Sequence, residues 1–327
     1  MRFFVISLIG ISILIALIPH LIFIVAKVLS WIFHFKVHYK YFGLVTLGLI
    51  GIWLLLAAYG NIWGRFRHET KELTLHYSTL PKAFDGYKIV HLSDLHLDGW
   101  KNHEAEMQQI VDEVNALDAD AIVFTGDLIS LSETELQTFV PILKQLKAKD
   151  GVYSILGNHD YMPYQRMWAD NQRADHLGKL ISMERDQLGW KLLLNENTTI
   201  HHGSDSIAIL GSENQSLGIH NIIHKGDLQK TMQGTDGLFR ILLTHDPTHW
   251  RGEVLGKTDI PLTLSGHIHG GQMNVFGLFY VSTFIYKEHA GLYSEKGQNL
   301  YVNIGIGGTM PMRVGATPEI TIITLKQ

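Results

Sequence analysis

Five short motifs of Asp, Asn and His follow apolar runs along this chain, and these residue types are common ligands of divalent cations. In chain order they are Asp94-x-His96, Gly126-Asp127, Gly157-Asn158-His159-Asp160, His245 and Gly266-His267-x-His269. On an extended backbone, residues i and i+2 point to one side, so Asp94 and His96, or His267 and His269, should face the same way. Imidazole, carboxylate and amide oxygen without sulfur suit Mn²⁺, Fe²⁺ or Zn²⁺. The motifs therefore predict a metal site.

The elements that must position these motifs have the pattern of alternating strands and helices. Apolar runs at 88–92, 121–124 and 152–156 predict buried strands, and each of these runs leads into one of the first three motifs. Apolar residues at helical spacing predict helices at 103–117 and 132–147. Polar residues at the carboxyl ends of successive strands are typical of an α/β sheet whose ligands gather at that edge.

Further apolar runs predict a second sheet that packs on the first, with no internal repeat or domain linker. Its expected strands are 190–194, 198–201 and 207–210, and two further apolar runs, 239–244 and 261–264, lead into the last two motifs. Strand-like runs also occur at 72–77, 301–306 and 319–325, and helices are expected within 161–187.

Composition excludes several classes of protein. The chain has 327 residues, a formal net charge of −4 and no cysteine. The soluble part has no basic cluster, so no nucleic-acid partner is expected. The absence of cysteine excludes disulfides, thiolate metal sites and a cysteine nucleophile. A zinc peptidase of the H-E-x-x-H type is also excluded, because that motif does not occur in the sequence.

The first 71 residues predict a membrane anchor. Residues 3–26 and 41–64 contain no Asp, Glu, Lys or Arg, and each stretch reaches the roughly 20 residues that a spanning helix needs. A cleaved signal peptide would have a shorter apolar region and a small-x-small cleavage site. We therefore expect transmembrane helices at about 3–26 and 41–60, a kink or an end at Pro19, and a catalytic domain at 72–327.

The orientation of this anchor is almost balanced. Two spans place the N-terminus and the catalytic domain on the same side of the membrane. The basic residues of the 27–40 connector compete with those outside it, and the positive-inside tendency only slightly favours a cytoplasmic catalytic domain. We expect an integral protein of a bacterial inner or plasma membrane.

Taken together, the five motifs resemble those of the calcineurin-like metallophosphoesterase superfamily, over nearly all of residues 72–325. The resemblance is specific, because five separated elements match in order. The GHIHGGQ form of the last motif, the sequence Pro318-Glu319-Ile320-Thr321 and the anchor resemble the YaeI/YkuE-like membrane phosphodiesterase branch. The fold that this resemblance implies is a four-layer α/β/β/α sandwich preceded by two transmembrane helices.

The resemblance also implies a role for each motif residue. It places Asp94, His96, Asp127 and His269 on a first metal ion, and Asp127, Asn158, His245 and His267 on a second. His159 matches the catalytic histidine, and Asp160 is expected to orient it. The nucleophile implied is a hydroxide that bridges the two ions, because two cations about 3.5–4 Å apart need a shared anion. Manganese is one candidate metal, and the native pair stays open.

The residues outside the motifs receive structural interpretations. The histidines not used by the family pattern are expected at the surface or in loops, namely His91, His103, His176, His201, His202, His220 and His224. Asp98 and Asp246 lie beside motif residues in the sequence. Each could hold a metal ligand in place by a hydrogen bond, and a surface position without this role is equally expected. The aromatic run from Phe276 to Tyr286 predicts an ordinary strand core, which we favour over an apolar, lipid-facing lip of the site.

The function expected from these features is a membrane-anchored, metal-dependent phosphoesterase that hydrolyses a phosphodiester or a pyrophosphate. The resemblance implies that the substrate can be lipid-linked, since some relatives in the resembled family hydrolyse lipid-linked UDP-sugars. Membrane lipid is the other expected partner. The alternative is a catalytically silent metal-binding membrane protein of the same fold. The complete set of motif residues favours the enzyme.

Overall fold

The computed structural model describes residues 2–218 and 223–327 of the chain. The chain forms two compact units. The first contains the residues up to Arg65 together with Met310–Val314, and the second contains Phe66–Thr309 and Gly315–Gln327. This division lies a few residues before the expected boundary at 71/72, because strand β1 (Glu69–His76) already belongs to a sheet of the second unit.

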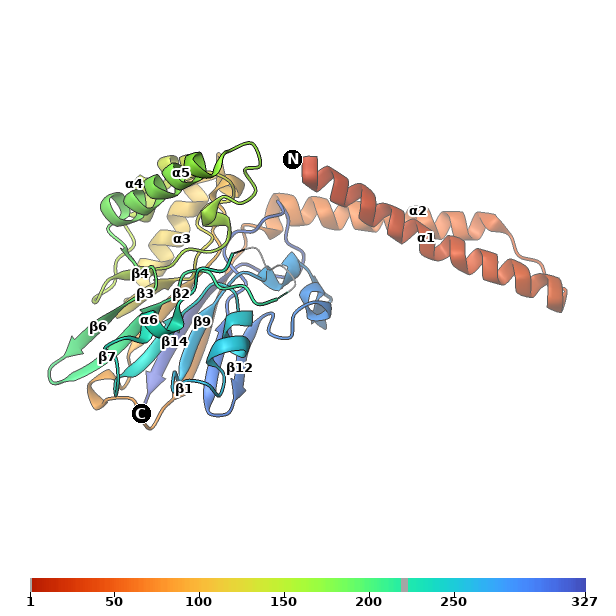
Figure 1. The fold of residues 1–327 in the computed structure, drawn as a ribbon. Coiled ribbons are helices and arrows are strands. Elements are labelled where there is room, and N and C mark those ends of the chain that lie inside the picture. The colour runs from red at the N-terminus through yellow and green to blue at the C-terminus, as the bar shows by residue number, and fades with distance from the viewer. Residues whose placement is uncertain (1, 219–222) are drawn as a thin grey trace. The chain divides into compact units, whose positions relative to one another are not determined.

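The first unit is built on two apolar helices, α1 (Arg2–Phe33) and α2 (Tyr39–Tyr59), and a π-helical turn, Gly60–Gly64 (Figure 1). The segments Leu8–Phe33 and Tyr39–Gly64 are long and apolar enough to cross a bilayer, and only 6% and 17% of their most apolar windows are buried. A core helix of a soluble protein would be mostly buried. Helix α1 continues through Pro19, so the expected end at this residue is wrong and the connector is shorter than predicted.

A segment from near the other end of the chain completes the first unit. The backbone N–H of Arg313 donates to the carbonyl oxygen of Gly60 at 3.1 Å, and the amide of Asn61 donates to the carbonyl oxygen of Pro311. These bonds satisfy backbone groups at the end of the second apolar helix, where intrahelical partners run out. Met310–Val314 is therefore part of the anchor unit.

The second unit contains two six-stranded sheets. In spatial order the first sheet consists of β1 (Glu69–His76), β14 (Glu319–Lys326), β2 (Lys88–Leu92), β3 (Ala121–Phe124), β4 (Val152–Ser154) and β5 (Lys191–Leu192). Strands β2 to β5 are parallel, whereas β14 is antiparallel to β2 and parallel to β1. The predicted strands that lead into the first three motifs are confirmed, and they end at one edge of this sheet.

In spatial order the second sheet consists of β12 (Gly291–Glu295), β13 (Gln298–Val302), β9 (Leu262–Ser265), β8 (Phe239–Leu243), β7 (Asp205–Gly211) and β6 (Glu196–His202). The run at 190–194 was expected in this sheet, and that expectation is wrong. Its strand β5 pairs in parallel with β4 and lies at the edge of the first sheet. The chain crosses between the sheets only after β5.

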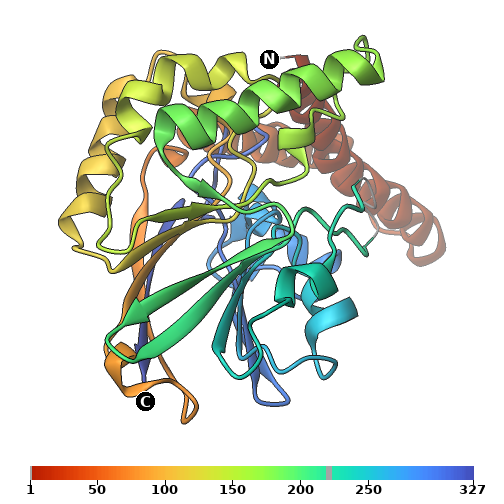
Figure 2. The ribbon, with the colours of Figure 1, turned by 60° about the vertical axis from the view of Figure 1, so that its left-hand side comes forward.

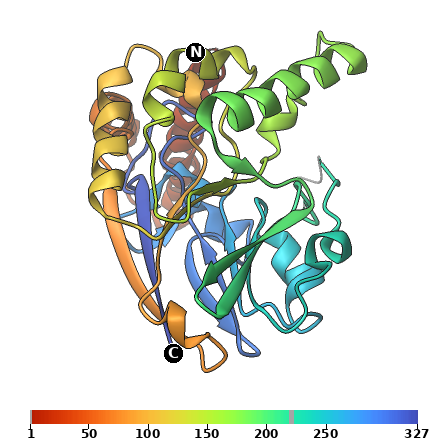
Figure 3. The ribbon, with the colours of Figure 1, turned by 90° about the vertical axis from the view of Figure 1, so that its left-hand side faces the viewer.

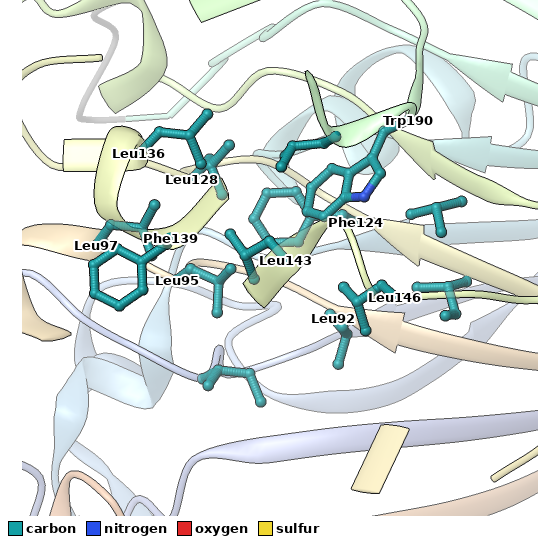
Figure 4. Packing of buried hydrophobic residues seen from close by; sticks show 14 of the residues in the cluster. Leu92, Leu95, Leu97, Phe124, Leu128, Leu136, Phe139, Leu143, Leu146 and Trp190 are labelled. Atoms are coloured by element: carbon teal, nitrogen blue, oxygen red, sulfur yellow. The ribbon is translucent and has the colours of Figure 1, made fainter. Parts of the chain in front are cut away.

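Alternation along the strands explains why the sheets are layered. Val90 and Ile122 point to one face of the first sheet and pack against α3 (Glu104–Ala116), α4 (Thr134–Leu143) and α5 (Asp170–Ser182). Figure 4 shows this layer around Phe124, with residues of the strands and helices in contact. Ile89 and Val123, which alternate with them, point to the opposite face and pack against the second sheet.

The outer face of the second sheet is covered by α6 (Leu228–Met232) and a π-helical turn at Trp250–Val254. Figures 2 and 3 show that these elements lie on the side of the sandwich opposite helices α3 to α5. The four-layer α/β/β/α fold is confirmed. A separate ribbon of β10 (Asn274–Val275) and β11 (Phe279–Tyr280) follows the last motif.

The remaining elements are short helical turns in the second unit. They are Lys82–Phe84, Leu97–Trp100, His159–Tyr161, Met183–Leu188, His269–Gln272 and Val281–Phe284. Three of them directly follow or contain motif residues, so most of the site is built from loops and single turns at the strand ends.

Candidate metal centre

The motif residues have a backbone conformation that the sequence did not predict. Asp94, His96, Asp127, His267 and His269 all have positive φ, between 48° and 74°. The left-handed region is uncommon for residues with a Cβ, and it clusters at functional sites. The expectation that the D-x-H and H-x-H pairs lie on extended backbone is therefore wrong. The strands end before each pair, and tight turns aim the side chains instead.

Backbone hydrogen bonds between the loops hold this conformation. The N–H of Asp94 donates to the carbonyl oxygen of Gly126 at 2.9 Å, and that of His96 donates to the carbonyl oxygen of Asp127 at 3.1 Å. Gly157 lies so close to Asp127 that a Cβ would collide with its carboxylate. These contacts fix one loop against the next with little freedom, as a preorganised site requires.

Four side chains from both sheets form the first group of candidate ligands. The donor atoms of Asp94, His96, Asp127 and His269 lie within 4.8 Å of one another, and all four residues are buried. Nε2 of His96 lies 3.4 Å from Oδ2 of Asp127 and 3.2 Å from Nε2 of His269. Nε2 of His269 lies 3.5 Å from Oδ1 of Asp94. The structure thus brings together the residues expected at the first ion.

A second group shares Asp127 with the first. The donor atoms of Asp127, His245 and His267 also lie within 4.8 Å of one another. Nε2 of His245 lies 3.2 Å from Oδ2 of Asp127, from Oδ1 of Asn158 and from Nδ1 of His267. His267 and His269 were expected to face one side together, but they belong to different groups.

The nitrogen positions provide a test of whether cations fit. Two ligands about 2.1 Å from one cation are about 3.0–3.4 Å apart at octahedral or tetrahedral angles. The pairs His96–His269 and His245–His267 each have facing ring nitrogens 3.2 Å apart. Facing lone pairs repel unless a proton or a cation lies between them. The spacing of both pairs therefore fits divalent cations.

In the His245–His267 pair, contacts on the side of each ring away from the centre fix which nitrogen faces the centre. Nδ1 of His245 lies 2.7 Å from the carbonyl oxygen of Thr125 and donates there, so Nε2 is the nitrogen that would bind a cation after losing its proton. Nε2 of His267 lies 3.6 Å from Oδ2 of Asp246, and Nδ1 faces His245. Carboxylates and carbonyls behind histidine ligands orient them and raise their basicity. Asp246 thus occupies a supporting position.

The protein alone concentrates unfavourable charge in this centre. Burial, opposed by His245 and reinforced by the Asp127 carboxylate, raises the pKa of Asp94 to about 7. Burial also opposes the ionisation of Asp127, but His245 and His159 hold the pKa of this carboxyl well below its usual range. Although burial opposes its protonation, the Asp127 carboxylate raises the pKa of His245 to about 10. A cation in each group would replace the protons that balance these carboxylates.

His159 and Asp160 lie beside the two groups, but they do not contact each other as expected. Nδ1 of His159 lies 2.8 Å from the carbonyl oxygen of Ser130. The Asp160 carboxylate instead accepts hydrogen bonds from the backbone N–H groups of Asp127, Gly157 and Ile129, at 2.8, 2.8 and 3.1 Å. The expectation that Asp160 orients His159 is wrong. Asp160 holds the loops, because a buried carboxylate needs several donors.

Several other expectations change in the structure. His91 was expected at the surface, but it is fully buried on β2 and lies 2.9 Å from the hydroxyl of Thr125. Asp98 is exposed, and His220 lies outside the described residues.

The sequence did not indicate Tyr164, whose ring lies 4.5 Å from that of His159 and whose hydroxyl accepts from the Asn158 amide at 3.4 Å. Only its place in the loop after the third motif could have pointed to it.

Comparisons with known proteins agree with this geometry. Residues 87–271 match the family of calcineurin-like phosphoesterases. The chain is 35% identical over 269 residues to "Uncharacterized metallophosphoesterase YkuE" of Bacillus subtilis, with 79% of this chain and 85% of that protein covered. It is 31% identical to "Transmembrane protein with metallophosphoesterase domain" of Danio rerio, with 84% of this chain covered and 61%, less than two thirds, of that protein.

A solved structure also aligns with the chain. It is the sulfate thiohydrolase SoxB of Thermus thermophilus, with 11% identity, a TM-score of 0.42, and 76% of this chain and 57% of that chain covered. A TM-score at that level supports no inference. The family match, by contrast, spans both groups of candidate ligands. The chain therefore belongs to the calcineurin-like phosphoesterase family, whose members are hydrolases that use two metal ions, and its two apolar helices and relatives indicate that it is associated with a membrane.

Proposed function

We propose that the protein is a membrane-anchored phosphoesterase that hydrolyses a phosphodiester or a pyrophosphate at a pair of divalent cations. The observation that carries the proposal is the pair of ligand groups that share the Asp127 carboxylate. Asp94, His96, Asp127 and His269 would hold the first cation. Asp127, Asn158, His245 and His267 would hold the second. When bound, the two cations supply Lewis acidity to the phosphoryl group and lower the pKa of a water that can attack it.

The chain's own residues position the reacting groups. The backbone N–H of His159 donates to Oδ1 of Asp127 at 2.8 Å, which leaves Oδ2 of Asp127 for the two groups. Nδ1 of His159 donates to the Ser130 carbonyl, so Nε2 on the other side of the ring is available to substrate. We assign His159, in its imidazolium form, as the residue whose Nε2–H donates a hydrogen bond or a proton to the phosphoryl or leaving oxygen, because a neutral ring with Nδ1–H would leave Nε2 an acceptor. Asp160 acts only through the loops that it holds.

The substrate class follows from the anchor. A site tethered to a bilayer searches a surface, which favours an amphiphilic phosphodiester or pyrophosphate over a freely diffusing metabolite. The register of the first sheet supports this proposal. Strand β1, which the chain enters from the anchor, is parallel to β14 and therefore antiparallel to β2. Its first residue lies at the edge where β2 ends and the site begins.

The domain division and the orientation are also proposals. The second unit should fold and bind cations without the helices, because the described candidate ligands all belong to it. A cytoplasmic position of this unit is favoured by the basic residues outside the connector. Expression of residues 72–327 tests the division. A folded fragment without metal would show that the anchor is part of the site.

The experiment that tests the function is a panel of monoesters, diesters and pyrophosphates, run with Mn²⁺ on the full chain in detergent. We expect turnover of a diester or a pyrophosphate and none for Asp127→Asn. A chain that binds two cations but hydrolyses no substrate of the panel would support the silent alternative. Equal turnover of short-chain and long-chain versions of one substrate in mixed micelles would contradict the lipid-linked substrate.

A further inference from the structure

The segment after the last motif exposes large apolar side chains. Phe276, Leu278 and Phe284 are 90%, 79% and 78% exposed. Phe279, Val281 and Ile285 add to the same surface, and we name these six residues the apolar ribbon tip. The expected strand core is therefore wrong for these residues. An apolar surface of this kind on a soluble domain usually marks an interaction site.

The turn at the end of the ribbon places a phenylalanine in a left-handed backbone conformation. Strands β10 and β11 pair Val275 with Phe279, and Leu278 donates to the carbonyl oxygen of Val275 at 2.9 Å. This places Phe276 and Gly277 at the turn, with φ of 52° and 74°. Such turns favour Asn or Gly, because a side chain at positive φ costs energy. An exposed phenylalanine there gains nothing in water.

The composition of the segment matches a membrane interface. No Asp, Glu, Lys or Arg occurs from 260 to 286, and Lys287 then follows directly and is exposed. Tyr280 follows Phe276 and Leu278 in the sequence, and Tyr286 follows Phe284. Aromatic side chains with a nearby basic residue are typical of segments that lie in the headgroup layer. A pairing surface for another protein would normally carry polar groups at its rim.

The chain connects the second unit to the anchor unit by short segments. The second apolar span ends at Gly64 and β1 begins at Glu69, so residues 65–68 join them. Four residues extend over at most about 14 Å. Gly315, which directly follows the Met310–Val314 segment of the anchor unit, lies so close to Asn274 that a Cβ would collide with its carbonyl oxygen. The ribbon thus begins beside a second chain connection to the anchor.

We propose that the apolar ribbon tip inserts into the headgroup and acyl boundary of the bilayer that the helices cross. The second unit then has its own membrane contact, and the contact is close in sequence to His269. Inserting Phe276, Leu278 and Phe284 removes three large, exposed apolar side chains from water, which favours insertion. The proposal depends on membrane association and not on the proposed reaction.

Depth measurements on the full chain test this insertion. Because the natural sequence has no cysteine, single variants Phe276→Cys and Phe284→Cys can each carry one nitroxide label. The protein is reconstituted in vesicles of phosphatidylcholine and phosphatidylglycerol at a molar ratio of about 3:1. Collisions with molecular oxygen, which concentrates in lipid, are compared with those of a water-soluble nickel chelate. Two matched controls are Leu47→Cys in α2 and Met167→Cys, which is 92% exposed in another loop.

We expect oxygen to dominate at positions 276 and 284, as at Leu47, and the nickel chelate to dominate at Met167. A nickel-dominated signal at both ribbon positions would overturn the proposal. Labels shielded from both agents, with spin–spin broadening that grows with protein concentration, would overturn it in favour of a second copy of the chain.

Introducing a charge into the apolar ribbon tip provides an independent variant. With the label at Leu278→Cys, adding Phe284→Asp should move the signal from oxygen toward the nickel chelate by several-fold, since an aspartate resists entry to the acyl region. Met167→Asp is the matched control and should leave the label depth unchanged. An unchanged depth with Phe284→Asp would contradict insertion. Neither readout requires turnover, so these results are independent of the proposed function.

Discussion

The two proposed cation positions of the centre differ in the charge that the protein supplies. Asp94 and Asp127 both face the first position, together with His96 and His269, and all four residues are buried. The second position has only the shared Asp127, the neutral amide of Asn158 and two imidazoles, and 11% of the His267 side chain is exposed. A position with two carboxylates attracts a divalent cation more strongly than a position with one shared carboxylate.

This difference indicates how a dinuclear site can keep one cation firmly and exchange the other. The first position should fill first and empty last. The second position is formed mainly by strand ends of the second sheet and by Asn158, next to the exposed ring of Tyr164. Because the protein supplies less negative charge there, a cation in the second position would attract a phosphate oxygen more strongly.

The largest effect is expected for Asp127→Asn, which removes the carboxylate that both positions share. The neutral amide cannot offset the repulsion of two cations, so metal content should fall to one equivalent or less and turnover should be lost. Elemental analysis of the purified chain measures this. Asp98→Asn changes an exposed carboxylate after the first motif in the same way and should keep two equivalents. Two bound metal equivalents in Asp127→Asn would contradict the role of Asp127 as the carboxylate that both positions share.

His159→Asn should separate chemistry from binding, because His159 belongs to neither position. Metal content should stay near two, and kcat should fall by about 10²–10⁴, the usual contribution of a positioned acid or hydrogen-bond donor. The loss should be smaller for a nitrophenyl ester than for an alkyl ester, which needs protonation of its leaving oxygen. His201→Asn, an exposed histidine on β6, is the control. Loss of a cation, or equal slowing of both esters, would remove the proposed role.

Asn158→Asp should reduce the difference between the two positions. The added carboxylate gives the second position a charge of its own, so its affinity should rise by about tenfold, or 1.4 kcal/mol. The measurement is the chelator concentration at which one of the two equivalents is lost. In the natural chain the equivalent that leaves first should come from the second position. If Asn158→Asp loses its metal equivalents at the same chelator concentrations as the natural chain, the charge of the ligands does not determine the relative affinity of the two positions.

The smallest expected effect is a change with pH in the number of protons that are released when the cations bind. The pKa of Asp94 is raised to about 7 and that of His245 to about 10, so both groups hold protons at pH 6 and mainly His245 does at pH 8. Filling both positions should release about one proton at pH 8 and at least about two at pH 6, so metal affinity rises with pH. Calorimetry in buffers of different ionisation enthalpy measures the release. A release independent of pH would contradict these raised pKa values.

Much of this architecture could be predicted from the sequence, because strands and helices follow from the spacing of apolar residues. The strands that carry Asp94, Asp127 and Asn158 and both flanking helices were predicted. The prediction that β5 belongs to the second sheet was wrong, because the sequence of a two-residue strand does not indicate which sheet it joins. Pairing of such a short strand is decided by where the preceding turn Met183–Leu188 delivers the chain.

The set of candidate ligands was predictable, but the way the backbone presents them was not. Positive φ at Asp94 and His267 depends on hydrogen bonds between loops that are far apart in sequence. For the same reason Asp160 was assigned to its neighbour His159, although its actual donors include the N–H groups of Asp127 and Ile129. Sequence proximity suggests a contact only where the local backbone is regular. The exposure of Phe276 was missed because apolar residues in a short strand normally face a core.

The central claim is that two cations act together in this chain, and activity measured against bound metal tests it most directly. The metal-free protein is titrated with Mn²⁺, and both bound equivalents and diester or pyrophosphate hydrolysis are measured at each step. We predict little turnover up to one equivalent, followed by a rise that ends at two equivalents. Full activity with one equivalent bound would contradict the account, as would a chain that binds two equivalents and hydrolyses neither substrate.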